Sequence, residues 1–349
     1  MAIQELYGEQ TGSGLQFDLG TDDSLIVGPD GFLVNVSTAG GLNENLISAL
    51  GSLQVVTILG TAYSYGDAIL LGDSPSDDAS QRLSVGVNGY VGSQTGVAAY
   101  LRCSAGTVEN WGTIDGNVGV AVVSGSASDP TTIENHGVIR GRGADAVYVS
   151  SLGTTSIINS GTIFGGNESA LDAISTAGSI SIVNTGTIKG LMEMGSGADT
   201  YDGRLGSADG LVDGNGGGDT LRGGTGGDKL SGGTGRDLLY GGGGADMFVY
   251  VDTGESTSAK AGRDLIGDFS HRNRDIIDLA DVDALAATGA DDDFTFIGRA
   301  AFSAGGAEVR YAIKGSSTFV YLNTDTDKPP EMTIELSGRI HLVASDFDL

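Results

Sequence analysis

Four aspartates recur at intervals of nine residues, and this repeat constrains the fold more than any other feature of the sequence. Each aspartate ends a six-residue block that is mostly glycine, and an apolar residue follows it two positions later. So many glycines cost too much backbone entropy for a helix, but they suit tight turns. The aspartates are Asp219, Asp228, Asp237 and Asp246, and the apolar residues are Leu221, Leu230, Leu239 and Phe248.

The three residues after each glycine block predict a minimal strand with one inward side chain. Two such units make one coil of a flattened spiral, and stacked coils give two parallel sheets around a core too thin to carry the fold alone. A flexible Gly/Asp linker is the alternative interpretation. The phase that the apolar residues keep with the aspartates through four repeats argues against a linker.

Stacked coils would also place the carboxylates in rows, which repel each other unless a cation neutralises them. Carboxylate and backbone carbonyl oxygens are hard ligands that suit Ca²⁺. The pattern resembles the hemolysin-type calcium-binding repeats of the RTX (repeats-in-toxin) family. That resemblance implies that the four aspartates bind Ca²⁺, with Asp199 and Asp209 of two looser copies as further candidates. The resemblance also implies Ca²⁺ ligands within the glycine-rich blocks, at Gly214, Gly216, Gly223, Thr225, Gly232, Thr234, Gly241 and Gly243.

A longer repeat runs through the first half of the chain. Its asparagines are separated by 25, 24 and 25 residues, and short β-prone runs and Gly corners accompany them: Asn110, Asn135, Asn159 and Asn184. This period predicts a parallel β-solenoid with a rise of about 4.8 Å per coil, in which the asparagines form an internal ladder. The repeat resembles those of autotransporter passengers and related right-handed β-helices. A β-sandwich of regular hairpins is the alternative.

The first 80 residues are less regular. Gly28–Gly31 predicts a turn, and 53–59 and 68–71 predict strands. Residues 43–50 predict either a short helix or a cap over the open end of the solenoid, since such an end needs its edge covered.

The composition changes after residue 250. The segments 264–269, 274–279, 294–298 and 345–349 occur in an order that resembles the C-terminal domain of serralysin-type secreted proteins. The resemblance implies a small β-sandwich that caps the calcium roll and an uncleaved signal for type I secretion. A plain structural cap without an export role is the alternative.

The chain is strongly acidic, which restricts its partners. Asp and Glu number 45 against 18 Lys and Arg, a formal net charge of −27 over 349 residues. This charge argues against nucleic acid and against anionic membrane surfaces. No apolar stretch is long enough to span a membrane, and the first ten residues lack the features of a secretory signal peptide. The single cysteine, Cys103, excludes an intrachain disulfide and predicts a small buried residue.

Enzymatic motifs are missing from the sequence. It contains neither a His-Glu-x-x-His zinc motif nor a Gly-x-Ser-x-Gly nucleophile elbow. Polysaccharide lyases and alginate epimerases also place a β-helix before calcium repeats, and they need basic side chains to neutralise uronates. The nearest candidate for such a cluster is Arg140, Arg142 and Tyr148 with His136 nearby, for which a solvated charged face is the preferred interpretation.

We therefore predict an all-β protein with three parts. A right-handed parallel β-helix spans 1–190, an RTX calcium β-roll spans 191–255, and a small C-terminal β-sandwich cap with a type I secretion signal spans 256–349. The predicted function is that of a secreted, non-enzymatic, calcium-binding protein at the cell surface. It would fold on calcium after type I secretion and self-associate as a surface layer, filament or adhesin subunit, with cell-surface polysaccharide as a candidate partner. The alternatives are a polysaccharide-active enzyme and a glycan-binding module.

Overall fold

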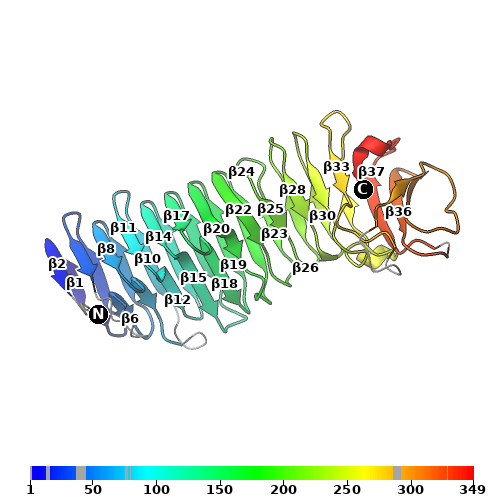
Figure 1. The fold of residues 1–349 in the computed structure, drawn as a ribbon. Helices are drawn as coiled ribbons and strands as arrows, with labels where there is room; N and C mark the ends of the chain where they lie inside the picture. Colours follow the sequence, from blue (N-terminus) through cyan, green and yellow to red (C-terminus); the bar gives the residue numbers. More distant parts are fainter. Residues whose placement is uncertain are drawn as a thin grey trace. The chain divides into compact units, whose positions relative to one another are not determined.

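The computed structural model describes residues 2–12, 16–36, 45–74, 78, 80–285, 292–327 and 329–349, without the side chains of 167 and 168. This part of the chain is almost entirely β, with parallel strands stacked coil upon coil (Figure 1). Its helical segments are two short 3-10 helices, η1 (Lys260–Gly262) and η2 (Ala344–Asp346). The predicted all-β, parallel fold class is confirmed. No helix among these residues has both the length and the apolar character that crossing a bilayer requires.

The chain divides into two compact units, residues 1–196, the solenoid unit, and residues 197–349, the roll unit. Each coil of the solenoid unit contributes strands to three columns, and every pairing between neighbouring coils is parallel. The first column contains β1 (Ile3–Leu6), β4 (Ser24–Val27), β7 (Val55–Ile58), β10 (Gln81–Val85), β13 (Gly106–Asn110), β16 (Thr131–Asn135), β19 (Thr155–Asn159) and β21 (Ile180–Asn184).

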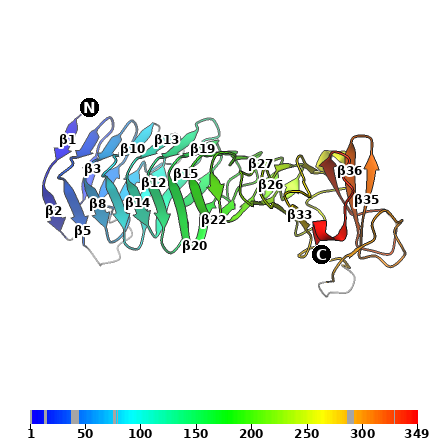
Figure 2. The ribbon, with the colours of Figure 1, turned by 90° about the horizontal axis from the view of Figure 1, so that it is seen from above.

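The other two columns continue each coil (Figure 2). The second contains β2 (Glu9–Gly12), β5 (Phe32–Asn35), β8 (Thr61–Ser64), β11 (Tyr90–Ser93), β14 (Thr113–Gly116), β17 (Val138–Gly141), β20 (Thr162–Asp172) and β22 (Thr187–Glu193). The third contains β3 (Phe17–Leu19), β6 (Ile47–Ala49), β9 (Ile69–Leu71), β12 (Val97–Arg102), β15 (Val118–Ser124) and β18 (Val147–Ser151). The long strand β20 also pairs with β18 and so belongs to both columns.

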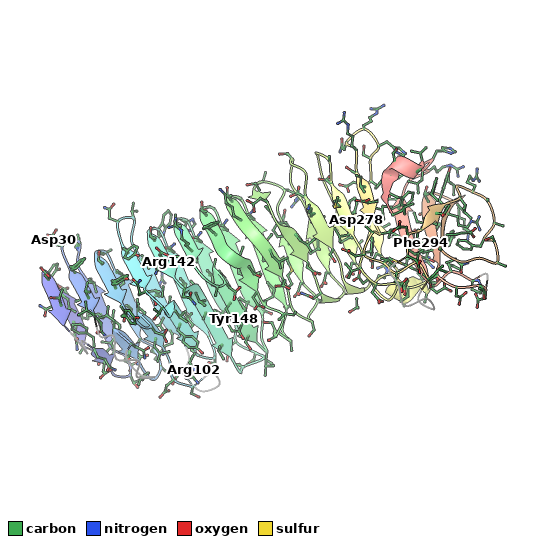
Figure 3. All side chains as sticks on the ribbon, in the orientation of Figure 1. Asp30, Arg102, Arg142, Tyr148, Asp278 and Phe294 are labelled. Atoms are coloured by element: carbon green, nitrogen blue, oxygen red, sulfur yellow. The ribbon has the colours of Figure 1, made fainter. Side chains whose placement is uncertain are left out.

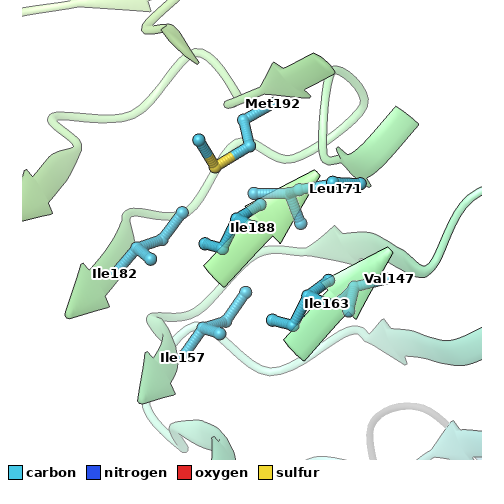
Figure 4. Close-up of a pocket in the computed structure, with 8 residues that line it drawn as sticks. Val147, Ile157, Ile163, Leu171, Ile182, Ile188 and Met192 are labelled. Carbon is cyan, nitrogen blue, oxygen red and sulfur yellow. The ribbon is translucent and has the colours of Figure 1, made fainter. Parts of the chain in front are cut away.

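Columns of aliphatic side chains fill the interior of the solenoid unit. One column joins Leu25, Val56, Leu83, Val108, Ile133, Ile157 and Ile182 in register, and all are at most 2% exposed. Burying each of these side chains contributes about 1.5–3 kcal/mol to folding. Figure 4 shows a small void between the columns that is lined only by apolar side chains, such as Ile163, Leu171 and Met192. An apolar void of this kind stays dry, so it is not a polar ligand site.

The predicted asparagine ladder is confirmed. Asn110 donates from Nδ2 to Oδ1 of Asn135 at 2.8 Å, Asn135 donates likewise to Asn159, and Asn159 to Asn184, each at 2.8 Å. Nδ2 of Asn110, Asn135 and Asn159 also donates to a strand carbonyl of the next coil: Val138 O at 3.0 Å, Thr162 O at 3.0 Å and Thr187 O at 3.3 Å. All four side chains are buried. The ladder therefore satisfies buried polar atoms from within the chain, as buried amides require.

The irregular first part of the chain is solenoid as well. The turn at Gly28–Gly31 is confirmed, since the Gly31 N–H donates to the Gly28 carbonyl at 2.8 Å, and β7 and β9 match the two predicted strands. The expectation of a helix or cap at 43–50 is wrong for residues 45–50, because β6 pairs there with β3 and β9 inside the sheet. Residues 43 and 44 lie outside the described residues. Cys103 is buried as predicted, and burial raises its pKa to about 12.

The roll unit also stacks parallel strands in two main columns. One column contains β23 (Thr200–Asp202), β27 (Thr220–Arg222), β30 (Leu238–Tyr240) and β32 (Leu265–Ile266). The other contains β25 (Leu211–Asp213), β28 (Lys229–Ser231), β31 (Met247–Val249) and β33 (Ile276–Asp278). Short strands β24 (Ser207–Ala208), β26 (Gly216–Gly217) and β29 (Thr234–Gly235) lie between them in the sequence.

The predicted thin core of the roll unit is confirmed, and it alternates between the two columns. Leu221 and Leu239 are in register in one column, and Leu230 and Phe248 in the other, all with no exposed surface. The alternation arises because one coil consists of two nine-residue units.

The C-terminal strands extend these two columns. They are β34 (Thr295–Phe296), β35 (Glu308–Lys314), β36 (Ser317–Asn323), β37 (Met332–Ser337) and β38 (Phe347–Asp348). Strands β35, β36 and β37 pair antiparallel, while β37 pairs parallel with β32 and β38 parallel with β33. The region predicted as a sandwich cap is thus mainly β, and its strands β37 and β38 pair with the edge strands of the roll. The predicted boundaries at residues 190 and 255 stay predictions.

Candidate metal centre

The aspartates of the glycine-rich blocks fall into two rows, because successive coils repeat every 18 residues. The first row consists of Asp199, Asp219, Asp237 and Asp264, and the second of Asp228, Asp246 and Asp275. In both rows Oδ1 of one aspartate accepts the backbone N–H of the preceding aspartate in that row. These distances are 2.7, 2.7 and 2.9 Å along the first row and 2.9 and 3.3 Å along the second.

The second carboxylate oxygen differs from one aspartate to the next. Within the described residues, Oδ2 is buried and has no hydrogen-bond partner in Asp219, Asp237 and Asp264 of the first row and in Asp246 of the second. In the second row, Oδ2 of Asp228 accepts the Gly224 N–H at 2.8 Å, and Oδ2 of Asp275 accepts the Ser270 N–H at 2.8 Å. A buried acceptor without a partner costs about 1–3 kcal/mol, and more when it is charged. Both rows therefore hold acceptor atoms that an added donor or cation would satisfy, and the first row holds most of them.

The pKa values of these carboxyls reflect their surroundings. Burial, together with the neighbouring charge of Asp237, raises the pKa of Asp219 to about 8. Burial raises the pKa of Asp237 and of Asp246 to about 6 each, and burial plus the charge of Asp237 raises that of Asp264 to about 9. Ionised carboxylates are thus unfavourable in the rows when no cation is present.

Glycine is required where each block begins, because the carboxylate lies against its Cα. A Cβ at Gly214 would lie 2.4 Å from Oδ2 of Asp219, and one at Gly232 would lie 2.4 Å from Oδ2 of Asp237. The Gly232 carbonyl lies only 2.7 Å from the Cβ position at Gly214. A carboxylate oxygen and a carbonyl oxygen therefore both lie close to the space that a side chain at Gly214 would occupy.

This donor set fits calcium. Buried carboxylates, orphaned oxygens and nearby backbone carbonyls are the hard, anionic ligands that Ca²⁺ binds six to eight at a time. A bound Ca²⁺ would supply the positive charge that the rows lack. The residues that would hold it are the row aspartates and the carbonyls of the glycine-rich blocks.

The structure places the other predicted ligands in the same turns. Gly216 pairs with Thr234 in the short β26–β29 ladder, and the Gly243 N–H donates to the Gly224 carbonyl at 2.9 Å, beside Thr225. The first glycine of the remaining blocks is also held against its own aspartate: Gly223 against Asp228 and Gly241 against Asp246. Asp199 is buried in the first row, whereas Asp209 is exposed. The assignment of these residues as ligands stays a prediction.

Sequence reasoning missed Asp264 and Asp275, which continue the rows beyond the last nine-residue unit. They follow their neighbours after 27 and 29 residues instead of 18, so they break the period. A signal was nevertheless present, because Ile266 and Ile277 follow these aspartates by two positions, as Leu239 follows Asp237. Both isoleucines are buried in register with the roll core.

The basic residues considered for a sugar-binding cluster each have a separate partner. Arg142, labelled in Figure 3, has its Nε 3.1 Å from Oδ1 of Asp115. His136 stacks on Trp111 with ring centroids 4.0 Å apart, and its Nδ1 lies 2.6 Å from the Ser160 hydroxyl. Arg140 lies over the ring of Phe164.

Comparisons with known proteins place the chain in a family. The family model described as peptidase M10 serralysin C terminal matches residues 30–348. No curated protein matches the chain. Two solved structures that match are the R2 and R3 subunits of the mannuronan C5-epimerase AlgE6 of Azotobacter vinelandii. The R2 subunit is 24% identical with a TM-score of 0.31, covering 47% of this chain and 93% of its own. The R3 subunit is 21% identical with a TM-score of 0.24, covering 48% and 80%.

The match to the serralysin model includes both the solenoid repeats and the aspartate rows. Serralysin-type RTX repeats generally bind calcium, in agreement with the donor set of the rows. Because the model matches most of its length, this chain belongs to the serralysin C-terminal family of RTX-type calcium-binding repeat proteins.

Proposed function

We propose that this protein is a secreted, non-enzymatic calcium-binding protein whose roll unit folds when Ca²⁺ enters the aspartate rows. The observation that carries the proposal is the first row, where Asp219 and Asp237 are buried, adjacent and each left with an unpartnered Oδ2. An apo roll must bury these acceptors either charged and repelling or protonated. Ca²⁺ removes that cost, so its binding free energy becomes folding free energy.

Folding of this kind suits export. Where Ca²⁺ is scarce the roll unit would stay unfolded, which is the state a type I secretion channel can carry. Outside the cell, calcium at millimolar concentration would drive it to fold. The charge of −27 supports this gating, since it penalises the compact state until cations bind.

For the protein after export we propose a structural or adhesive role at the cell surface, by self-association. Among the described residues, β1 pairs only with β4 and β2 only with β5, so each leaves one edge open. Open edges are ready templates for another strand. Ile3 on β1 is 62% exposed. At the other end of the same column, Ile158 and Val183 lie opposite each other on β19 and β21 and form an exposed apolar pair.

Light scattering on the full chain, titrated with Ca²⁺ from excess chelator to millimolar concentrations, tests both parts of the proposal. Circular dichroism on the same samples reports folding. Reversible growth of large particles together with a folding transition is the expected result. A folding transition in a protein that stays monomeric would reject self-association but keep calcium-dependent folding. No spectral response to calcium would reject both.

Glycan binding is the second candidate, and one surface of the solenoid unit favours it. A Cβ at Gly92 would lie 2.4 Å from the Tyr90 ring and 2.7 Å from the Tyr63 ring, so both aromatic rings pack against the glycine and leave no room for a side chain. The Tyr90 hydroxyl lies 3.4 Å from Oδ2 of Asp115, and Oδ1 of the same carboxylate pairs with Arg142. Aromatic faces beside charged groups are suited to sugars. Binding on a glycan array that is lost in Gly92→Val would support this role, and turnover of uronate chains would instead indicate an enzyme.

A further inference from the structure

Three carboxylates outside the aspartate rows meet in the connection between β36 and β37. They belong to Asp325, Asp327 and Glu331, and one carboxylate oxygen of each lies within 4.8 Å of those of the other two. Asp325 and Asp327 are exposed and Glu331 is half-buried. No ion pair found in the described part of the chain includes any of them. At this spacing the three negative charges oppose each other.

Backbone hydrogen bonds hold two of these carboxylates in place. Oδ1 of Asp325 accepts the Asp327 N–H at 2.7 Å, and Oε2 of Glu331 accepts the Thr324 N–H at 2.7 Å. The connection is further fixed at Pro330, whose carbonyl accepts the Ser258 hydroxyl at 2.6 Å. Each carboxylate keeps another oxygen for a ligand. The cluster is thus held together in spite of its repulsion.

An independent observation comes from Asn323, the last residue of β36. Its side chain has no exposed surface, and its Nδ2 donates to the Asp327 carbonyl at 3.2 Å, which aims the amide into the turn that holds the cluster. Within the described residues its Oδ1 has no hydrogen-bond partner. Leaving a buried amide oxygen unpaired costs about 1–3 kcal/mol. A cation in the turn would satisfy this oxygen and the three carboxylates together.

The spacing of these residues points to the same chemistry. Asn323, Asp325 and Asp327 alternate along the chain, and Glu331 follows. Loops that bind Ca²⁺ commonly supply oxygens from alternate residues and complete the shell with a later glutamate. We propose that the β36–β37 connection is a further Ca²⁺ site. Its ligands are Oδ1 of Asn323 and the carboxylates of Asp325, Asp327 and Glu331.

Such a site would stabilise the antiparallel strands of the roll unit independently of its aspartate rows. Ca²⁺ would tie the end of β36 to the start of β37, next to the point where the Ser256 hydroxyl donates to the Thr333 carbonyl at 2.7 Å. Removing the site should therefore leave calcium-dependent folding of the rows intact. This separates a failure of the present inference from a failure of the proposed function.

The test counts bound calcium in the full chain by equilibrium dialysis and elemental analysis. The double variant Asp325→Asn/Asp327→Asn keeps hydrogen-bond acceptors but removes two charges. We expect it to bind about one Ca²⁺ fewer per chain than the parent protein. The control Asp18→Asn/Asp30→Asn removes two exposed carboxylates from the solenoid unit and should bind the parent number. An unchanged number in the first variant would overturn the proposal.

Asn323→Asp provides a second test that does not depend on weakening the fold. If Ca²⁺ binds here, the added carboxylate is a stronger ligand, so the parent number of ions is retained and thermal stability at saturating calcium is equal or higher. If no cation binds, a fourth carboxylate is buried beside three others and the variant loses stability at every calcium concentration. That second result would overturn the proposal even where the double variant had failed to fold.

Discussion

In the solenoid unit the stacked polar column is made of asparagines, whereas in the roll unit it is made of aspartates. Both columns repeat once per coil, both are buried, and both hydrogen-bond from coil to coil. An amide carries a donor and an acceptor, so Asn135 accepts from Asn110 and donates to Asn159. A carboxylate carries acceptors alone, so Asp237 satisfies Oδ1 with a backbone N–H and leaves Oδ2 without a partner among the described residues.

The difference in one functional group thus separates two ways of stabilising a stack of coils. The asparagine column is neutral and complete within the chain. The aspartate column needs something from solution that is positive and binds oxygen. Calcium dependence should therefore be confined to the roll unit. A carboxylate placed in the asparagine column should destabilise the solenoid unit, and an amide placed in the aspartate row should weaken calcium binding by the roll unit.

The largest effect is expected when a carboxylate is placed in the ladder by Asn135→Asp. Its oxygens would face the Asn159 Oδ1 and the Thr162 carbonyl, which the amide now donates to. A buried, unpaired charge of this kind should cost about 3–5 kcal/mol of unfolding free energy. Denaturant unfolding of the solenoid unit near neutral pH measures the loss. Glu134→Gln on the outside of the same strand is the control, and an equally small change in both variants would contradict the account.

The converse exchange, Asp237→Asn, should weaken calcium binding. The amide oxygen can still accept the Asp219 N–H, but one ligand charge is lost from the first row. We expect the calcium concentration at the midpoint of roll folding to rise on the order of tenfold. Circular dichroism during a calcium titration measures it. Asp281→Asn, which changes an exposed carboxyl outside the rows, should leave the midpoint in place. An unshifted midpoint for Asp237→Asn would remove that residue from the site.

A smaller effect should appear as pH dependence in the roll unit. The folded pKa values of Asp237 and Asp246 are raised to about 6, and that of Asp219 to about 8. A raised carboxyl pKa means that the calcium-free fold holds protons that the unfolded chain has lost. The protonated carboxyls therefore contribute fully to the stability of the calcium-free fold below about pH 4, and this contribution is lost as pH rises through the folded pKa values. Between pH 6 and 8 protons stabilise the calcium-free fold but no longer bind the unfolded chain, so more calcium should be needed for folding as pH rises over this range. A calcium midpoint that falls as pH rises over this range would contradict the raised pKa values of these carboxyls.

The smallest effect is expected on the outside of the ladder coil. His136 stacks on Trp111 and is not part of the buried column. His136→Ala should lower the unfolding free energy of the solenoid unit by about 0.5–1 kcal/mol. Thermal unfolding detects such a change. If the loss equals that of Asn135→Asp, outer contacts matter as much as the inner column and the comparison fails.

Several features of the fold could be predicted from the sequence because they are periodic. The phase between Asp237 and Leu239 predicted both the turn and the buried strand, and the spacing of Asn110 and Asn135 predicted the ladder. Periodicity fails where a coil carries an insertion. Asp264 and Asp275 follow longer coils, so they were missed although their buried isoleucines keep the phase.

Other features depend on contacts that spacing does not reveal. The strand β6 is short and lies between turns, so its residues did not alternate for long enough to distinguish a strand from a cap. The cluster at Asp325, Asp327 and Glu331 forms only when β36 and β37 pair as a hairpin. The unpartnered Oδ1 of Asn323 depends on burial, which no short motif indicates.

Hydrogen exchange of the full chain, with saturating calcium and with excess chelator, tests the central comparison most directly. The ladder strands β13, β16 and β19 should be protected in both conditions, because their stacked asparagine amides are hydrogen-bonded within the chain. Strands β27 and β30 of the first row should be protected with calcium and exchange freely with chelator. Equal protection of β27 and β30 in both conditions would contradict the account, since the aspartate row would then be stable without a cation.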